Sequence, residues 1–333
     1  MTNTRQSLYE RRRYFAMALD PIHVGTGGYR LGRVDMSIVR EPGTNLPKIP
    51  GTSLTGACRT FAAMQETGKF PHCAGQGQAN KSGTYRGHCG KHDCPICATF
   101  GFAKEEQSFQ GLAQLSDARL VLFPVHSLAG PVWVTCPDVL RELDAWKPSF
   151  REPADGEVTV STPLHVGDRL NLGWLMLNNV SNAFTLDGEL KAVPQEVRDR
   201  AALVSNKIFG HVANDNLEVR TSVSISPETG AAAEGALFTY EALPRSAILA
   251  FDLVVSDPAH YTIGGQQPLA NSGGKEKVLN TVEAGLGLFE VLGVGGMSTR
   301  GMGRLRVLNL PAESKAQFPE DAQRGARTTE AKR

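Results

Sequence analysis

Four of the chain's six cysteines lie close together, at spacings typical of a metal site. Cys89, Cys94 and Cys97 form a C-x4-C-x2-C pattern, and fifteen residues separate Cys73 from Cys89. Thiolates two to four residues apart, together with a more distant fourth ligand, suit one tetrahedral zinc ion. The alternative is a set of free thiols or disulfides. The spacing predicts a zinc site in which the fourth ligand is Cys73 or one of two neighbouring histidines, His88 and His72.

The segment around these cysteines, residues 70–105, is polar and rich in glycine, so it offers little apolar material for a core of its own. Bound zinc supplies folding free energy to a segment of this kind. A site closed by four protein ligands is structural, because it leaves no position open for a substrate. We therefore expect zinc to fold an insertion here and not to catalyse a reaction. A metal-type cysteine cluster without a secretory signal is typical of the reducing cytosol, so we expect a cytoplasmic protein.

A glycine-rich segment near the other end of the chain offers a second kind of chemistry. Residues 293–304 contain five glycines, among them Gly295 and Gly296, while Ser298, Thr299 and Arg300 add hydrogen-bond donors. Glycines allow close backbone approach, and successive N–H groups can form a nest for an anion. The segment matches neither G-x-x-x-x-G-K-[ST] nor a strand-led G-x-G-x-x-G, so nucleotide hydrolysis is not indicated. A phosphate cradle and a flexible turn are both compatible with it.

Composition excludes some classes of protein. The chain has 333 residues, enough for one large or two small domains, and 41% of them are hydrophobic. No apolar run approaches the length of a membrane span, and residues 14–19 read as a first strand and not as part of a signal peptide. A net charge of +1, from 35 basic and 34 acidic residues, argues against binding nucleic acid with the whole surface. A local basic track is still compatible, because only charges near phosphates count.

Hydrophobic periodicity and turn residues divide the rest of the chain into alternating strands and helices. Residues 54–65 read as a helix with one apolar face, and Thr52 or Ser53 is its expected N-cap. Long polar stretches between the elements favour an α+β core that carries large insertions. The expected strands are 14–19, 34–39, 113–123, 132–135, 217–225, 247–255 and 304–308, and the other expected helices are 137–146 and 277–292.

The order of several short motifs resembles that of one known family. The chain reads His23-Val-Gly-Thr-Gly, then Gly32-Arg-Val-Asp35, then Pro47-Lys-Ile-Pro-Gly-Thr-Ser-Leu-Thr-Gly-Ala-Cys-Arg59, then Leu115-Ser-Asp-Ala-Arg119 and Leu122-Phe-Pro-Val-His-Ser-Leu128, and it ends on the glycine-rich segment. With these motifs, residues 14–310 resemble the RAMP superfamily of CRISPR proteins, and specifically the repeated backbone subunit of type III (Cmr/Csm-like) effector complexes. The Ser-Asp-Ala-Arg and Phe-Pro-Val-x-Ser-Leu pieces are the most specific of them.

This resemblance implies an α+β fold with an RRM-like (ferredoxin-like) palm, a thumb hairpin and a zinc-binding insertion. The palm is expected to be a single domain over residues 1–310, with the insertion at 70–105, the thumb within 205–240 and a flexible polar tail at 311–333. In such complexes, copies of the subunit stack into a filament along a guide CRISPR RNA. Each thumb displaces a base pair between guide and target RNA at regular intervals. The implied partners are guide RNA, target RNA, other copies of the chain and other subunits of the complex, with no membrane.

The resemblance also implies a catalytic role for Asp35, which matches the family's aspartate in the loop after the first strand. His23, in the same glycine-rich region, is a second candidate. RNA carries its own nucleophile, the 2′-OH, so an endoribonuclease can work by positioning that oxygen and by holding a hydrated Mg²⁺ or Mn²⁺ on Asp35. The residues alone are equally compatible with an Asp35 that caps the loop or forms a salt bridge with Arg33 or Arg40.

Guide-RNA contacts are implied at two places. Ser53, Thr55 and Arg59 lie on the first helix just after Pro-Gly, where N–H groups and hydroxyls meet phosphates. The second place is the glycine-rich segment, with Gly295, Gly296, Ser298, Thr299 and Arg300. Ordinary capping would also explain Ser53, and a solvated helix face would explain Arg59. Three other interpretations stay open: a backbone subunit whose aspartate is idle, a zinc-containing RNA-binding protein outside CRISPR and, least favoured, a guide-processing nuclease of the same superfamily.

Overall fold

The computed structural model describes residues 8–27, 34–75, 87–104, 107–232 and 237–315. One part of its main sheet is antiparallel: β1 (Tyr9–Ala18) lies between β15 (Leu305–Val307) and β14 (Ile248–Ser256), and β14 pairs with β6 (Ala118–Val125). Two short strands add to it, β5 (Ala113–Leu115) on β14 and β2 (Lys48–Ile49) on β6. Helix α1 (Gly51–Gln65) follows β2 along the chain, and α6 (Gly274–Gly287) and α7 (Phe289–Leu292) lie between β14 and β15.

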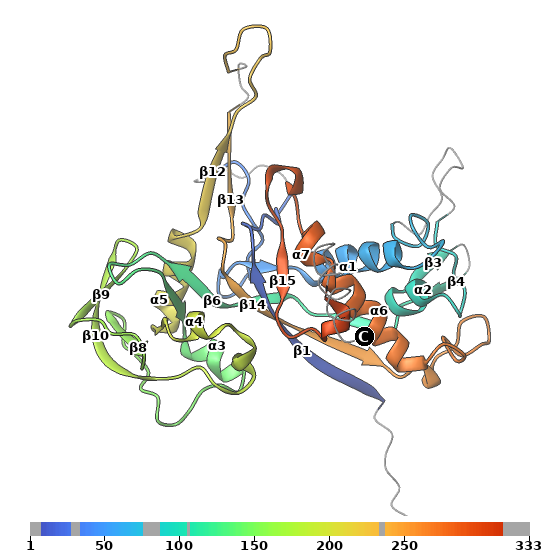
Figure 1. The fold of residues 1–333 in the computed structure, drawn as a ribbon, viewed down its shortest axis with the longest axis horizontal. Helices are drawn as coiled ribbons and strands as arrows, with labels where there is room; N and C mark the ends of the chain where they lie inside the picture. The colour runs from blue at the N-terminus through green and yellow to red at the C-terminus, as the bar shows by residue number, and fades with distance from the viewer. Residues whose placement is uncertain (1–7, 28–33, 76–86, 105–106, 233–236, 316–333) are drawn as a thin grey trace, which may run out of the picture.

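Both faces of β1 are covered, because successive side chains of a strand point to opposite faces. Tyr14 belongs to the core cluster that α1 and α6 close, whereas Phe15 belongs to a second cluster on the other face. Figure 1 shows α1, α6 and α7 gathered beside β1 and β15. The Tyr14 hydroxyl donates to Glu283 of α6 over 2.6 Å. Gly285 lets α6 approach α1 closely, since a Cβ there would lie 2.4 Å from the carbonyl oxygen of Cys58.

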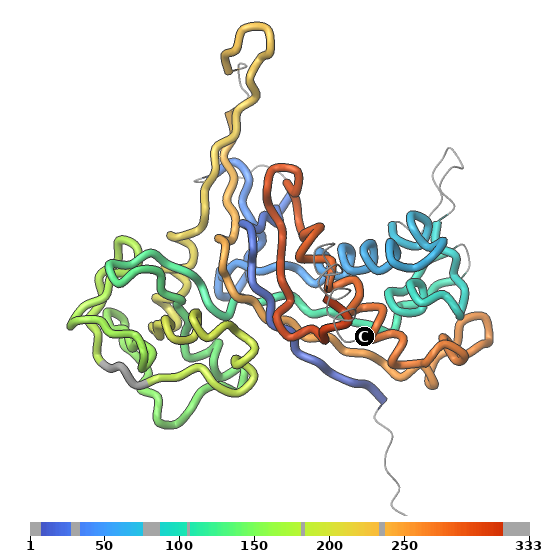
Figure 2. The backbone as a smooth tube through the Cα atoms, viewed as in Figure 1, coloured from blue at the N-terminus to red at the C-terminus, as the bar shows by residue number. Residues whose placement is uncertain are grey.

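The sheet continues into a second lobe, on the left of Figure 2. There β7 (Val132–Thr135) pairs with β6, and β11 (Ala201–Leu203), β8 (Glu157–Ser161), β10 (Leu175–Phe184) and β9 (Arg169–Leu172) follow. β11 runs parallel to β7 and β10 parallel to β8, so the whole sheet is mixed. Nine of its eleven strands follow the order β15-β1-β14-β6-β7-β11-β8-β10-β9, and β2 and β5 pair beside this path. The helices of this lobe are α3 (Pro137–Glu142), α4 (Gln195–Arg198) and α5 (Asn206–Asp215).

A two-stranded hairpin projects from between the two parts of the sheet (Figure 1). Its strands, β12 (Glu218–Ser222) and β13 (Phe238–Ala242), are antiparallel and form a sheet of their own. Several apolar side chains of the hairpin are exposed instead of entering the core: Val219, Val223, Ile225 and Leu237. Folding does not require apolar side chains in such positions, so they are available for contacts with another molecule.

The segment that contains the cysteine cluster folds beside α1 and α6, on the opposite side of the molecule from the second lobe (Figure 2). Its regular elements are α2 (Pro95–Phe100), β3 (Phe102–Lys104) and β4 (Gln107–Phe109). Residues 76–86 and 105 of the expected insertion, and residue 106 just beyond it, lie outside the described part of the chain. So do 233–236 of the expected thumb range and 316–333 of the expected tail.

Many elements expected from the sequence are confirmed, including the strand at 132–135 and, within a few residues, the first helix and the strands near 217–225, 247–255 and 304–308. The α+β class is also confirmed. Among the described residues, none of the helices has both the length and the apolar character needed to cross a bilayer.

Three expectations were wrong in detail. The strand expected over 113–123 is divided into β5 and β6, because Ser116 and Asp117 turn their side chains to other segments. The strand expected over 34–39 forms only isolated bridges, and the helix expected over 277–292 is divided into α6 and α7 at Leu288. Most of the second lobe was not anticipated.

Candidate functional site

The four cysteines meet at one point of the insertion. All four Sγ atoms lie within 4.8 Å of one another. Sγ of Cys97 lies 3.7 Å from that of Cys89 and 3.8 Å from that of Cys73, and the Cys73 and Cys94 sulfurs are 4.0 Å apart. A tetrahedron with zinc–sulfur bonds of about 2.3 Å has edges of about 3.8 Å. The cluster could therefore hold one metal ion such as zinc, and the Sγ spacing fits that ion.

Neither alternative fourth ligand, His72 or His88, belongs to this group of four, and His88 makes a hydrogen bond elsewhere. Its Nε2 lies 2.7 Å from the carbonyl oxygen of Gly75, and a carbonyl can only accept, so Nε2 carries a proton. Burial lowers the pKa of His88 below its ordinary value, which favours the neutral ring. The cysteine cluster is complete without this histidine, and we keep Cys73 as the fourth ligand.

Arg59 anchors the insertion to α1. Its side chain is buried, its Nε donates to the carbonyl of Cys73 over 2.7 Å, and its Nη1 donates to the carbonyl of Gly101 over 2.8 Å. These two carbonyls lie at the beginning and near the end of the insertion. The structure therefore gives Arg59 a structural contact where the sequence suggested a contact with guide RNA, and we leave Arg59 out of the proposed RNA surface.

The start of α1 differs from the expected capping. Pro50 is the N-cap residue, and no side chain of α1 caps the helix. Instead, Asp117 of the Ser-Asp-Ala-Arg motif accepts the N–H of Gly51 over 2.7 Å and pairs with Lys48. Ser53 and Thr55 therefore keep hydroxyls that the helix end does not use, in half-buried positions on the first turns.

Asp35 lies exposed at the root of the hairpin. Its Oδ2 accepts two hydrogen bonds from Thr239, one from the backbone N–H over 2.7 Å and one from Oγ1 over 2.9 Å. These bonds, the backbone one first, hold the pKa of Asp35 below its ordinary value. The carboxylate is therefore ionised near neutral pH, so it can attract a cation or accept a proton but is a poor proton donor.

His23 is buried near the same root. Its Nδ1 lies 2.7 Å from the carbonyl oxygen of Glu241, so Nδ1 carries a proton, and in the neutral ring Nε2 is left as an acceptor. The ring meets Tyr240 edge to face at 6.0 Å. Gly25 leaves room beside Nε2, because a Cβ there would come within 3.1 Å of it.

The structure brings Asp35 and His23 to the same strand but not to the same face. Neighbouring residues of a strand point to opposite faces. Thr239, which binds Asp35, and Tyr240, which contacts His23, are neighbours on β13. Strand β13 therefore separates the two candidates, and they do not form one catalytic pair in this conformation.

The glycine-rich segment packs against His23. The N–H of Gly296 donates to the His23 carbonyl over 2.9 Å, and Gly295 has a φ of 89° at a place where a Cβ would lie 2.6 Å from that carbonyl oxygen. These glycines are thus required by close packing. Ser298–Arg300 form an exposed 3₁₀ turn beyond them, and the Arg300 guanidinium lies 5.3 Å from the centroid of the Phe238 ring.

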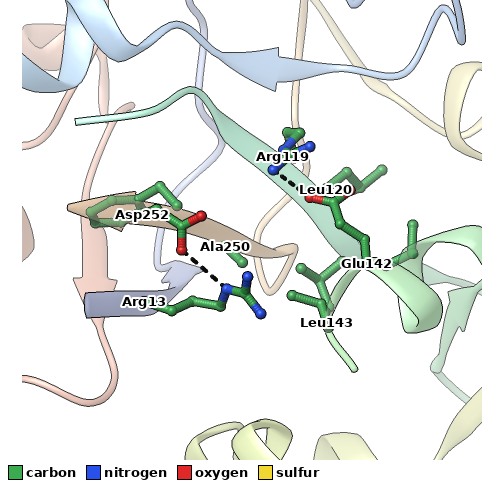
Figure 3. Close-up of a pocket in the computed structure, with 10 residues that line it drawn as sticks. Arg13, Arg119, Leu120, Glu142, Leu143, Ala250 and Asp252 are labelled. Atoms are coloured by element: carbon green, nitrogen blue, oxygen red, sulfur yellow. Dashed lines mark hydrogen bonds and ion pairs between the residues drawn. The ribbon is translucent and has the colours of Figure 1, made fainter. Parts of the chain in front are cut away.

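Many other arginines are neutralised. Figure 3 shows Arg13 reaching Asp252, and Arg119 reaching Glu142, around a small cleft between β14, β6 and α3. These charges are paired, and the cleft contains none of the candidate residues. Further ion pairs join Arg11 to Asp252, Arg12 to Glu283, Arg40 to Glu241, Arg304 to Asp20 and Arg306 to Glu290.

Sequence reasoning missed Thr239 and Glu241. Glu241 is buried, and its carboxylate accepts the N–H of Ile38 over 2.8 Å and pairs with Arg40 at 2.6 Å, which fixes the loop beyond Asp35. The only signal in the sequence was a carboxylate within the apolar strand that contains Tyr240.

Comparisons with known proteins place the chain in a family. The family model of the RAMP superfamily matches residues 16–306. The CRISPR system Cmr endoribonuclease Cmr4 of Pyrococcus furiosus is 26% identical over 264 residues, covering 72% of this chain and 79% of that protein. A chain in a cryo-EM structure of Type III-B Cmr-beta bound to cognate target RNA has a TM-score of 0.61 at 16% identity, over 91% of this chain and 99% of that one.

A crystal structure of Cmr4 gives a TM-score of 0.54 at 19% identity, over 91% of this chain and 100% of that one. At such identities the two structures establish a shared fold. The family model, by contrast, matches the sequence from within β1 to within β15 and includes the Asp35 loop, the hairpin and the whole glycine-rich segment. The protein belongs to the RAMP superfamily.

Proposed function

We propose that this chain is the repeated backbone subunit of a type III CRISPR effector complex, which binds guide RNA along a filament and cleaves complementary target RNA at regular intervals. The sequence similarity to the Cmr4 endoribonuclease supports the nuclease role. The observation that carries the proposal is the Asp35 carboxylate, which is ionised, exposed and fixed by Thr239 at the root of a projecting hairpin.

The strand order supports an RRM-like palm. Along the chain the elements run β1, α1, β6, β14, α6, β15, and in space the strands lie in the order β15-β1-β14-β6. That is the βαββαβ arrangement of ferredoxin-like folds. In this proposal residues 1–310 form one palm domain, the cysteine segment is a zinc-folded insertion over 70–105, and the tail follows residue 310.

The hairpin β12–β13 would serve as the thumb. Its exposed apolar side chains belong to the class that wedges between stacked bases in other nucleic-acid complexes. A wedge that opens the backbone can bring a 2′-OH into line with the adjacent phosphorus, which contributes by positioning. Because Asp35 is hydrogen-bonded to Thr239 near the start of β13, its carboxylate would stay at a fixed distance from the wedge.

The donor set at Asp35 suits a weakly held divalent cation. Mg²⁺ is commonly bound by one or two carboxylates together with substrate phosphates and water. A hydrated Mg²⁺ or Mn²⁺ held by Asp35 would stabilise charge on the phosphate oxygens. Asp35 itself would contribute its negative charge and its orientation, and its lowered pKa keeps it from acting as the acid. His23, on the other face of β13, would be a positioning residue on the side of the glycine-rich segment.

The proposed partners are guide RNA, target RNA, further copies of the chain and other subunits, in the cytoplasm. The second candidate function is a structural backbone subunit without catalytic activity. One observation favours it: the two hydrogen bonds from Thr239 would also be expected of an aspartate that merely caps the hairpin root.

Cleavage by assembled complexes separates the two functions. Asp35→Asn keeps the size of the side chain and an oxygen for the Thr239 N–H, but it removes the charge. Complexes with this variant should bind end-labelled target RNA as well as wild type and should lose cutting at every regularly spaced site together. EDTA should have the same effect, and the wild-type products should end in a 2′,3′-cyclic phosphate. Undiminished cutting by Asp35→Asn complexes would move the catalytic role to another residue, with His23 next in line, whereas wild-type complexes that bind target RNA without cutting it would favour the structural function.

A further inference from the structure

Arg300 differs from the paired arginines of the chain. Its side chain is exposed on the 3₁₀ turn of the glycine-rich segment, and no acidic side chain in the described part of the chain forms an ion pair with it. Its guanidinium lies over the Phe238 ring, at 5.3 Å from Cζ to the ring centroid. This cation–aromatic contact joins the glycine-rich segment to β13 at the hairpin root.

The Phe238 ring, which Arg300 contacts, packs in an apolar cluster. Phe238 is half-buried, and its ring centroid lies 5.9 Å from that of Tyr240. Both rings pack in a small apolar cluster of their own, with Met36, Met297 and Met302. The packed ring therefore gives the exposed Arg300 guanidinium, which lies over it, an aromatic support.

We propose that Phe238 and Arg300 form a stacking subsite for one nucleobase of single-stranded RNA. The proposal rests on the proposed function, because it names a subsite of the same RNA-binding surface. Unpaired bases stack on aromatic rings and on arginine planes, and they do so whatever their sequence. The N–H groups of Arg300 at the edge of the stack are positioned to bind the phosphate of the stacked nucleotide.

The position of this subsite on β13 links it to Asp35. Phe238 precedes Thr239 on β13, and Thr239 holds Asp35 on the opposite face of the strand. A base stacked at Phe238 would fix the RNA backbone beside the root of the hairpin. The strand would then connect the stacked base on one face with the carboxylate on the other.

The competing explanation is that the contact only fastens the glycine-rich segment to the hairpin. In that case, removing the ring would lower stability but leave RNA binding unchanged. Phe238→Leu preserves the apolar packing and removes the stacking face, while Arg300→Lys keeps the charge and removes the plane. Phe70→Leu is a matched control, because Phe70 is an exposed ring beside the insertion, away from this surface.

The experiment measures binding of the full-length chain to a single-stranded RNA that contains 5-iodouridine, over a series of salt concentrations. Ultraviolet crosslinks are then mapped to peptides by mass spectrometry. Phe238→Leu should weaken binding about 10-fold, as expected for the loss of one stacked base, without changing the salt dependence. Arg300→Lys should also weaken binding at unchanged salt dependence, and Phe70→Leu should have no effect. Crosslinks of the wild-type chain should map to Phe238.

Each contrary result has a distinct meaning. If the wild-type chain does not bind single-stranded RNA, the proposed function fails and the subsite fails with it. If the wild type binds RNA but Phe238→Leu binds equally well, the subsite is refuted and the proposed function stands. Should Phe238→Leu fail to fold by circular dichroism, Arg300→Lys decides the question: unchanged affinity in that variant refutes the subsite.

Discussion

Thr239 determines how the Asp35 carboxylate can act. Its backbone N–H and its hydroxyl both donate to Oδ2, and the N–H of Asp35 donates back to the Thr239 hydroxyl over 3.1 Å. An anion that accepts such bonds is stabilised relative to the acid. The same bonds orient the carboxylate relative to the hairpin, so one residue fixes both the charge and the direction of Asp35.

Removing the Thr239 hydroxyl should raise the pKa of Asp35 part of the way to its ordinary value. Thr239→Val deletes one of the two donors and leaves the backbone N–H, which is the larger cause of the shift, while Thr239→Ser keeps both. Because the folded pKa is depressed, the bond contributes stability above the unfolded pKa and loses it as the pH falls through the folded pKa. Carboxyl-detected NMR with ¹³C-labelled aspartate would measure the shift, and an identical titration of Thr239→Val and wild type would contradict it.

The residues of the site could be predicted from the sequence only where they belong to a short local motif. Asp35 and His23 lie in short glycine-bordered motifs, and the four cysteines have diagnostic spacings. Thr239 and Glu241 lie about two hundred residues further along the chain than the loop they hold. A contact of that kind is made by the fold, so no spacing in the sequence indicates it.

Among the elements, the cysteine segment should depend on metal more than the sheet does. Metal analysis of purified chain should give close to one zinc per molecule. Replacing Cys94 and Cys97 with serine should expose residues 70–105 to protease while β1 and β14 stay protected, because these strands also pack in a second core, around Phe15, that contains no residue of the insertion. Cys58→Ser, a cysteine outside the cluster, is the control for zinc content. Zinc-free protein with a protected insertion would contradict the prediction.

Arg59 should matter for stability and not for RNA. Arg59→Met removes the hydrogen bonds that a buried guanidinium donates to the carbonyls of Cys73, Phe100 and Gly101, so it should destabilise the chain by about 3 kcal/mol. Urea unfolding would measure this. The salt dependence of RNA binding should be the same as in wild type. A shallower salt dependence with unchanged stability would restore the interpretation of Arg59 as a phosphate contact.

The elements differ in how well the sequence predicted them. Strand β14 and helix α1 show a clear apolar run or face, and their positions were confirmed within a few residues. The second lobe contains strands as short as β11, too short for an alternation to be recognised, and several are flanked by helices of a single turn. Hydrogen bonds from distant side chains also determine where some elements begin, as when Asp117 accepts the N–H of Gly51 at the start of α1. Local helix propensity does not indicate such contacts.

At the scale of the whole molecule, charge is distributed in pairs. The net charge is +1, and the arginines of β1 and β15 are bound to carboxylates. The basic track that the sequence left open therefore does not lie on β1. Arg300 of the glycine-rich segment, which forms no ion pair with any described residue, is available for a phosphate near the hairpin root.

Binding of the chain to single-stranded RNA should consequently weaken with salt and depend little on sequence. Each phosphate contact contributes about 0.7 to the slope of log affinity against log salt. Fluorescence anisotropy with oligonucleotides of different base composition should give parallel salt plots. The matched variant is Arg306→Gln, whose charge is already paired with Glu290, and it should leave the slope unchanged. A salt-independent affinity, or a strong preference for one base, would contradict this prediction.

The contacts of Arg59 also have a consequence for how the insertion can vary. One guanidinium recognises two backbone carbonyls, at Cys73 and Gly101, and every residue type offers such a carbonyl. These hydrogen bonds therefore do not depend on the side chains between those points or on how many residues there are. A metal-folded module of another length could be grafted between the same two carbonyls, provided that it supplies the apolar side chains that Ile96 and Phe100 place in the core with α1 and α6.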